Sequence, residues 1–245
     1  RQGRRCGCRT LLYGAGLGPL SAHGWEKCAA ALNECADTIV FRERASLAAA
    51  REHGVKAPEL VLGADGALET DVSAAPREDI LLVCPRQGRG APPFPAECAR
   101  AAAALGAKRG WRVRYVAMNV RQDLPLCQAL AAETGGEVIA APEDTAALTR
   151  LFAAARFTVS MRLHAHTLSY LAGTPALGID GDERIAAFAG ECGIPCRPAE
   201  EGGGLAAALE AAIEAKAPGT EQWSDRLAAG RAALARALRE KEKKS

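Results

Sequence analysis

The stretch "SMRLHAHTLSYLAGTP", residues 160–175, places an arginine and two of the chain's four histidines between a β-branched run and an apolar helical pattern. Arg162 carries a planar guanidinium, which suits a phosphate or a carboxylate. Histidine is the side chain whose ordinary pKa lies closest to neutral, so His164 would suit proton transfer. Because a helix that starts after a strand also directs backbone N–H groups toward a ligand, this junction predicts an anion site with an acid or base beside it.

The same junction also has a purely structural interpretation, and the pattern alone weighs the two equally. Arg162 would then pair with a local carboxylate, and His164 would cap the helix. His166 lies two positions further on, where a helix points its side chain to another side, so we do not expect a metal-binding pair with His164. We interpret His166 as a packing residue, and the sequence leaves open whether it contacts a substrate.

Polar residues that follow other strands are further candidates for substrate contacts. Arg86 and Arg89 in "VCPRQGRG" could meet an anion or could belong to a solvated basic loop. Arg42 in "RERAS" is a weaker candidate, since an exposed pair with Glu43 would contribute little. Asp123 in "MNVRQD" is equally suited to capping a helix and to touching a substrate.

The glycines of "YGAGLGP", residues 13–19, follow one strand pattern and precede a helical one. Gly16 and Gly18 would let the backbone approach a ligand closely. Their spacing does not match the dinucleotide fingerprint G-x-G-x-x-G, so a tight turn without a ligand is an equal alternative.

Strand patterns alternate with helical patterns along most of the chain, which predicts parallel sheets covered on both faces. A polar stretch at 66–78 separates two such runs. We expect two doubly wound units, an N-terminal Rossmann-like unit at 1–75 and a C-terminal one at 79–245, although the last helix could cross back to the first unit. Strands are expected at 10–13, 37–43, 58–65, 79–86, 111–119, 136–140, 156–161 and 175–179, and helices at 22–35, 46–52, 95–108, 122–133, 143–155, 164–172, 183–191, 203–216 and 220–243.

Composition excludes several classes of protein. A net charge of +2 is too small to indicate a nucleic-acid partner. The nine cysteines form no C-x-x-C pair, which favours small buried thiols in a reducing compartment over a disulfide framework. We find no signal peptide and no membrane-spanning run, so we expect a cytoplasmic protein. The sequence also has no P-loop and no G-x-S-x-G, which excludes the enzyme classes that those motifs mark.

Several tracts occur in the order in which a known family has them. "SMRLHAHTLSYLAGTPALGI" and "DERIAAFAGECGIP" carry an S-M-R-L-H-A motif, a small-residue helix and a G-x-P element before an apolar strand. "YGAGLGPL", "DTIVFRERAS" and "GADGAL" precede them. From Leu11 to Ile194 the sequence resembles the polysaccharide pyruvyl transferase family.

The resemblance implies an α/β, GT-B-like fold of two Rossmann-type units with a cleft between them. It also implies transfer of the pyruvyl group of phosphoenolpyruvate onto a sugar of a cell-wall or capsular polysaccharide precursor, as a ketal, with release of phosphate. His164 matches the motif histidine, which is expected to act as general acid. Arg162 matches the motif arginine, which is expected to hold the donor's phosphate or carboxylate.

Further substrate contacts and partners follow from that chemistry. A donor with two anionic groups needs at least two cationic contacts, so Arg86 is the expected second one. Weaker candidates for substrate binding are Arg42, Gly16 and Gly18. The chemistry requires no metal and no cofactor besides phosphoenolpyruvate as donor. The other partner is a saccharide acceptor, and a lipid-linked acceptor would bring the protein to a membrane surface.

The sequence departs from the family pattern in two places. The family usually opens with a strand and helix that carry G-G-x-N-x-G-D, which this sequence lacks, so we expect the first unit to be N-terminally incomplete. In "GIDGDERI" Asp180 stands where the family tends to have S-Y-D-x-K, and the role of Asp180 stays open.

Two other functions remain as alternatives. A GT-B glycosyltransferase that uses a nucleotide sugar would need an acidic residue late in the chain to bind the ribose, and Glu183 or Glu191 could serve. A truncated, non-catalytic relative would only bind an anionic glycan or a partner.

Overall fold

A computed structural model describes residues 6–18, 20–72, 74–88, 92–180, 183–199, 203–215 and 220–242. The chain divides into two compact units, one formed by 1–70 with 219–245 and the other by 71–218. Both are built from parallel strands connected by helices, so the predicted α/β class is confirmed.

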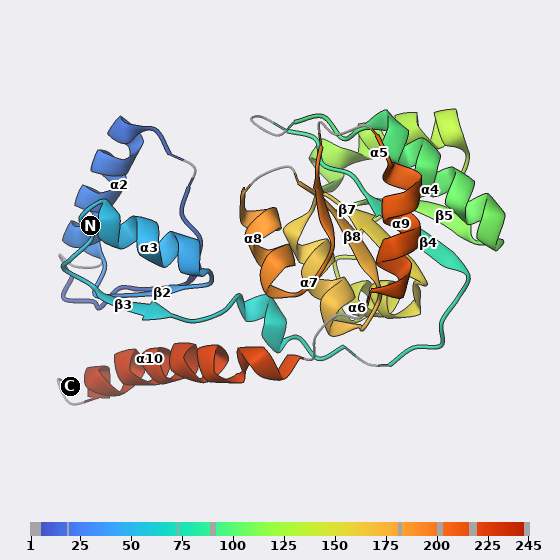
Figure 1. Cartoon of the computed structure of the whole chain (residues 1–245). Coiled ribbons are helices and arrows are strands. Elements are labelled where there is room, and N and C mark those ends of the chain that lie inside the picture. Colours follow the sequence, from blue (N-terminus) through green and yellow to red (C-terminus); the bar gives the residue numbers. More distant parts are fainter. Residues whose placement is uncertain are drawn as a thin grey trace. The chain divides into compact units, whose positions relative to one another are not determined.

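The first unit has a three-stranded parallel sheet in the order β1 (Leu11–Ala15), β2 (Thr38–Phe41) and β3 (Glu59–Leu62). The central strand β2 is buried along its whole length, because the helices cover both faces of the sheet. Figure 1 shows α2 (Ala22–Cys35) and α3 (Arg44–Glu52) on one face and α10 (Ser224–Glu242) on the other. A short 3-10 turn, η1 (Gly66–Glu69), follows β3 in part of the stretch that the sequence predicted to be a linker.

Helix α10 belongs to the first unit, although the sequence assigned all of 79–245 to the second. Arg226 Nε donates a hydrogen bond to the Gly63 carbonyl at 2.7 Å, just after β3. Gly230 lies so close to Tyr13 that a Cβ atom there would come within 2.8 Å of the tyrosine hydroxyl. These contacts correct the predicted boundary and match the alternative in which the last helix crosses back.

The second unit has a six-stranded parallel sheet in the order β6-β5-β4-β7-β8-β9. The sequence predicted every strand in it except the last, which is only three residues long. The strands are β4 (Ile80–Cys84), β5 (Arg112–Ala117), β6 (Glu137–Ala140), β7 (Phe157–Ser160), β8 (Ala176–Asp180) and β9 (Cys196–Pro198).

Helices cover both faces of this second sheet (Figure 1). The helices are α4 (Ala96–Arg109), α5 (Val120–Thr134), α6 (Thr145–Ala154), α7 (Leu163–Leu171), α8 (Glu183–Glu191) and α9 (Leu205–Glu214). All five residues of β4 are buried, and they alternate between two cores. Leu81 and Val83 join the core beneath α4, α5 and α9, whereas Ile80, Leu82 and Cys84 join the core beneath α6 and α7. A continuous apolar strand is therefore what a two-faced parallel sheet requires here.

Candidate functional site

The order of the second sheet reverses at β4, with β5 and β6 on one side and β7, β8 and β9 on the other. In open α/β sheets, ligands bind beyond the carboxyl ends of the strands at such a reversal. Cys84 pairs with Ser160 at the ends of β4 and β7. Arg86 and Arg162 each come two residues after that pair, so the topology brings two sequence-predicted arginines to one edge of one sheet.

The turn from β7 into α7 is held by side chains within the motif. The Ser160 hydroxyl accepts a hydrogen bond from the Arg162 backbone N–H at 2.8 Å, and Arg162 is the N-cap residue of α7. His166, one turn into the helix, has its Nε2 atom 2.9 Å from the Ser160 carbonyl oxygen. Since a carbonyl only accepts, Nε2 carries the proton.

His166 is completely buried, as expected of a packing residue. Burial lowers the pKa of His166 to about 4, although the hydrogen bond to Ser160 acts in the opposite direction. The imidazole is therefore neutral at pH 7 and serves as a fixed support for the turn.

Asp123, in the first turn of α5, is the anionic partner of Arg162. Its carboxylate is completely buried and accepts hydrogen bonds from the backbone N–H of Gln87 at 3.1 Å and of Asn119 at 2.8 Å. The Nη2 group of Arg162 also donates a hydrogen bond to this carboxylate. From the sequence, Asp123 was equally suited to capping a helix and to touching a substrate. The sequence did not identify Arg162 as its ion-pair partner.

His164 lies in the first turn of α7, and its side chain is exposed. The Arg162 side chain is 19% exposed. His164 therefore reaches the surface at the strand-to-helix junction, and its role as an acid remains a prediction.

The first unit has its own charged cluster at the carboxyl edge of its sheet. Arg42 follows β2 and pairs with Asp65, which follows β3, at 3.1 Å. Arg42 Nε also lies 3.7 Å from Oε2 of Glu43, and the Oε1 atom of Glu43 accepts a hydrogen bond from the Ser46 hydroxyl at 2.6 Å. The pair with Glu43 is as the sequence suggested, but it is largely buried rather than on the surface.

The two glycines singled out from sequence have structural reasons for being glycine. A Cβ atom at Gly16 would lie 3.0 Å from atoms of both Arg42 and Glu43, so Gly16 lets the charged cluster approach the backbone. Gly18 has a φ of +99°, which L side chains rarely adopt. Their predicted contacts with a substrate remain predictions.

Arg86 is half-buried just beyond β4, whereas Arg89 lies outside the described residues. Asp180 forms the end of β8, at the same edge of the sheet as Arg162. The Glu183 side chain is also outside the described part of the chain, and Glu191 ends α8.

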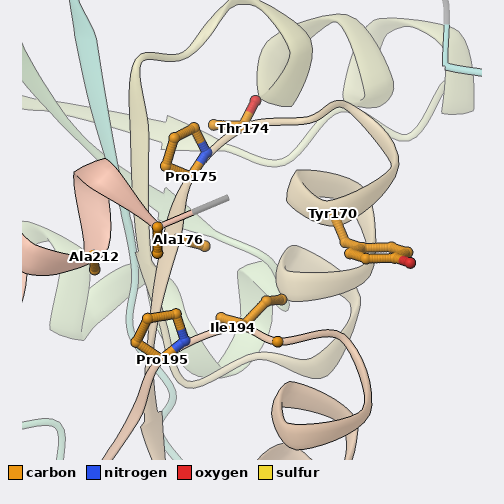
Figure 2. A pocket seen from close by; sticks show the side chains of 9 residues that line it. Tyr170, Thr174, Pro175, Ala176, Ile194, Pro195 and Ala212 are labelled. Atoms are coloured by element: carbon orange, nitrogen blue, oxygen red, sulfur yellow. The ribbon is translucent and has the colours of Figure 1, made fainter. Parts of the chain in front are cut away.

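A small hollow opens at the opposite edge of the second sheet. Figure 2 shows its lining, which includes Pro175 and Ala176 at the start of β8 and Pro195 just before β9. Because it lies at the amino ends of the strands and is lined mostly by apolar side chains, we do not assign the site to it.

Within the ranges that the structure covers, no group of three or more His, Cys, Asp and Glu side chains is arranged to hold a metal ion. No helix in the described part of the chain is both long and apolar enough to cross a membrane.

Comparison with known proteins gives one family and one fold. The family described as "Polysaccharide pyruvyl transferase" matches residues 3–183, more than half of the chain. No curated protein matches. Among solved structures, UDP-N-acetylglucosamine 2-epimerase from Rickettsia bellii is similar with a TM-score of 0.64 and 11% identity, over 97% of this chain and 69% of that one.

Two further solved structures show the same likeness. UDP-GlcNAc 2-epimerase from Neisseria meningitidis, bound to UDP-GlcNAc, has a TM-score of 0.60 and 13% identity over 97% of this chain and 71% of that one. A UDP-forming α,α-trehalose-phosphate synthase from Burkholderia xenovorans has a TM-score of 0.52 and 15% identity over 84% of this chain and 57% of that one. At such low identity these likenesses show the fold alone, and they confirm the predicted GT-B-like class.

Proposed function

Because the chain belongs to the polysaccharide pyruvyl transferase family, we propose that it transfers the pyruvyl group of phosphoenolpyruvate to a sugar of a cell-wall or capsular polysaccharide precursor. The observation that carries this proposal is the placement of Arg86 and Arg162 just beyond the paired ends of β4 and β7. Phosphoenolpyruvate has a phosphate and a carboxylate, and guanidinium groups bind both well. The Arg162 side chain is 19% exposed, so part of it lies within reach of an anion from solvent.

The proposed reaction begins with a proton. His164, as general acid, protonates the methylene carbon of phosphoenolpyruvate, which makes the neighbouring carbon oxocarbenium-like. Two sugar hydroxyls add to that carbon, each losing a proton, and the C–O bond to phosphate breaks. One hydroxyl proton balances the new methyl hydrogen, the other leaves with hydrogen phosphate, and the product is a pyruvate ketal. A positioned acid contributes typically ~10²–10⁴-fold to such a step.

We propose that the carboxyl edge of the first sheet also contributes to substrate binding, through Arg42, Gly16 and Gly18. The donor is phosphoenolpyruvate, and no separate cofactor or metal takes part. The acceptor is a saccharide, and a lipid-linked one would hold the otherwise cytoplasmic protein near a membrane.

The experiment is direct: the purified protein is incubated with phosphoenolpyruvate and a panel of hexose and hexosamine acceptors. We expect phosphate release together with a ketal methyl signal by NMR. His164→Ala should abolish turnover with the fold kept, whereas His23→Ala, an exposed histidine on α2, should not. Unchanged turnover in His164→Ala would show that His164 is not the general acid.

The two alternative functions predict other results. Stabilisation by UDP but not by phosphoenolpyruvate in a thermal-shift assay would favour a nucleotide-sugar enzyme. Glycan binding without turnover would favour a non-catalytic relative.

A further inference from the structure

Three loops of the second unit meet at one buried carboxylate, that of Asp123. Gln87 follows β4, Asn119 follows β5 and Arg162 follows β7, and each donates a hydrogen bond to Asp123. These are the loops that surround the reversal point of the sheet. We infer that Asp123 is a positioning residue, which sets the guanidinium of Arg162 for the anionic donor. The inference rests on the proposed function of the same site.

Burial makes the contact between Asp123 and Arg162 important for the stability of the carboxylate. A carboxylate removed from water is costly unless charged and polar partners compensate it. Asp123 is completely buried, whereas the Arg162 side chain is 19% exposed. The pair therefore has a buried anchoring end and a partly exposed end, so the acid fixes one side of the guanidinium and leaves other N–H groups for a ligand.

Helix capping alone does not account for Asp123. The Asn119 side chain already caps α5, since it accepts a hydrogen bond from Gln122 N–H at 3.3 Å. Asp144 caps α6 through Ala147 N–H at 2.8 Å with an exposed carboxylate. Asp144 also lies 4.0 Å from Arg150, but both side chains of that pair are exposed. A cap thus does not need a buried ion pair, and the burial of Asp123 against Arg162 calls for a further explanation.

The contacts also separate Asp123 from a direct substrate ligand. In every hydrogen bond described above, Asp123 accepts from an N–H group of the protein itself. A buried carboxylate would also repel an anionic substrate. Asp123 is therefore expected to act through Arg162, and its effect should vanish when Arg162 is absent.

The test measures binding of inorganic phosphate and of phosphoenolpyruvate by titration calorimetry, with turnover measured in parallel. Asp123→Asn keeps the shape but loses the charge-assisted contact that holds Arg162. We expect this loss to outweigh the relief of repulsion, so that the affinity for both anions falls about tenfold or more. KM for phosphoenolpyruvate should rise more than kcat falls. Asp144→Asn, the exposed cap, is the matched control and should leave anion affinity unchanged.

A double-mutant cycle distinguishes positioning from a structural role. In an Arg162→Ala background, Asp123→Asn should cause no further loss of phosphate affinity. Equal losses in both backgrounds, or wild-type affinity in a folded Asp123→Asn protein, would overturn the inference. If the Asn variant does not fold, Asp123→Glu keeps the charge but moves it by one methylene; wild-type phosphate affinity in that variant would overturn the inference equally.

The outcomes separate this inference from the proposed function. A wild-type protein that binds phosphate through Arg162 and Asp123 but never consumes phosphoenolpyruvate with any acceptor contradicts only the proposed function. A wild-type protein that binds neither anion contradicts both.

Discussion

The Nε2 atom of His166 lies 2.9 Å from the carbonyl oxygen of Ser160, and both residues are completely buried. This contact fixes the last residue of β7 against the first turns of α7. Since Arg162 lies between the two, a neutral buried imidazole holds the turn that presents the arginine.

The stability of the protein should depend on pH through His166. Its pKa in the folded state is about 4, below the ordinary value of 6.5. Between these values the unfolded chain binds a proton that the folded chain does not, so the free energy of unfolding falls as pH drops from 7 toward 4. The full effect is roughly 3 kcal/mol.

His166→Gln is the variant that tests this, because glutamine can still donate to Ser160 but does not titrate in this range. Urea unfolding at pH 7.5 and pH 5, followed by circular dichroism, should show a smaller loss of stability in the variant than in the wild type. His23→Gln, at an exposed position, should behave as wild type. An equal acid loss in His166→Gln would show that other groups cause it.

Arg86→Ala should weaken the use of phosphoenolpyruvate. Loss of a hydrogen bond to a charged group costs about 1.5–3 kcal/mol, which corresponds to a fall of roughly 10- to 150-fold in kcat/KM. Arg112→Ala is the control, since Arg112 lies at the amino end of β5 and its pairs with Glu78 and Glu137 are exposed. Steady-state kinetics of the two variants gives kcat/KM for phosphoenolpyruvate. An equal, small effect in both would show that Arg86 does not contact the donor.

Gly106→Ala should destabilise the second unit. A Cβ atom there would lie 2.8 Å from a methyl carbon of Val113 and 2.9 Å from the Trp111 carbonyl oxygen, so α4 would have to move off β5. We expect a loss of about 1–3 kcal/mol by thermal or urea unfolding. Gly190→Ala, in α8 of the same unit, meets no atom within 4 Å and should be neutral or stabilise by up to ~1 kcal/mol. The reverse order of the two variants would contradict the packing described here.

Arg226→Lys should loosen α10 from the first unit. Arg226 donates to the Gly63 carbonyl at 2.7 Å and stacks over Trp223, with its guanidinium carbon 4.5 Å from the ring centroid. Lysine keeps the charge but loses the planar fork, so we expect a loss of about 1–2 kcal/mol. Arg231→Lys, in an exposed pair with Glu69, should change stability by less than ~0.5 kcal/mol. Hydrogen exchange of the β3 amides would report the difference, and equal protection in both variants would contradict it.

Sequence periodicity predicted the regular elements well because they are amphipathic or continuously apolar. The ranges 22–35 and 183–191 coincide with α2 and α8. Strand β9 was missed because three residues, one of them proline, carry no periodic signal. The unit to which α10 belongs could not be read from its own pattern, since an apolar face does not specify its partner.

The candidate residues could be chosen from the sequence for the same physical reason, and their roles in a site remain predictions. Residues that follow strands are visible in sequence, and so Arg162, His164, Arg86 and Arg42 could be singled out. The pairing of Arg162 with Asp123 joins residues 39 positions apart, and it depends on the spatial order of strands that sequence spacing does not give.

Helix α10 is translated after the second unit, yet it completes the first. On the ribosome, the six-stranded sheet can therefore close before the three-stranded one has the helix that covers its other face. Until α10 has left the exit tunnel, the face of the first sheet that this helix covers stays open to solvent.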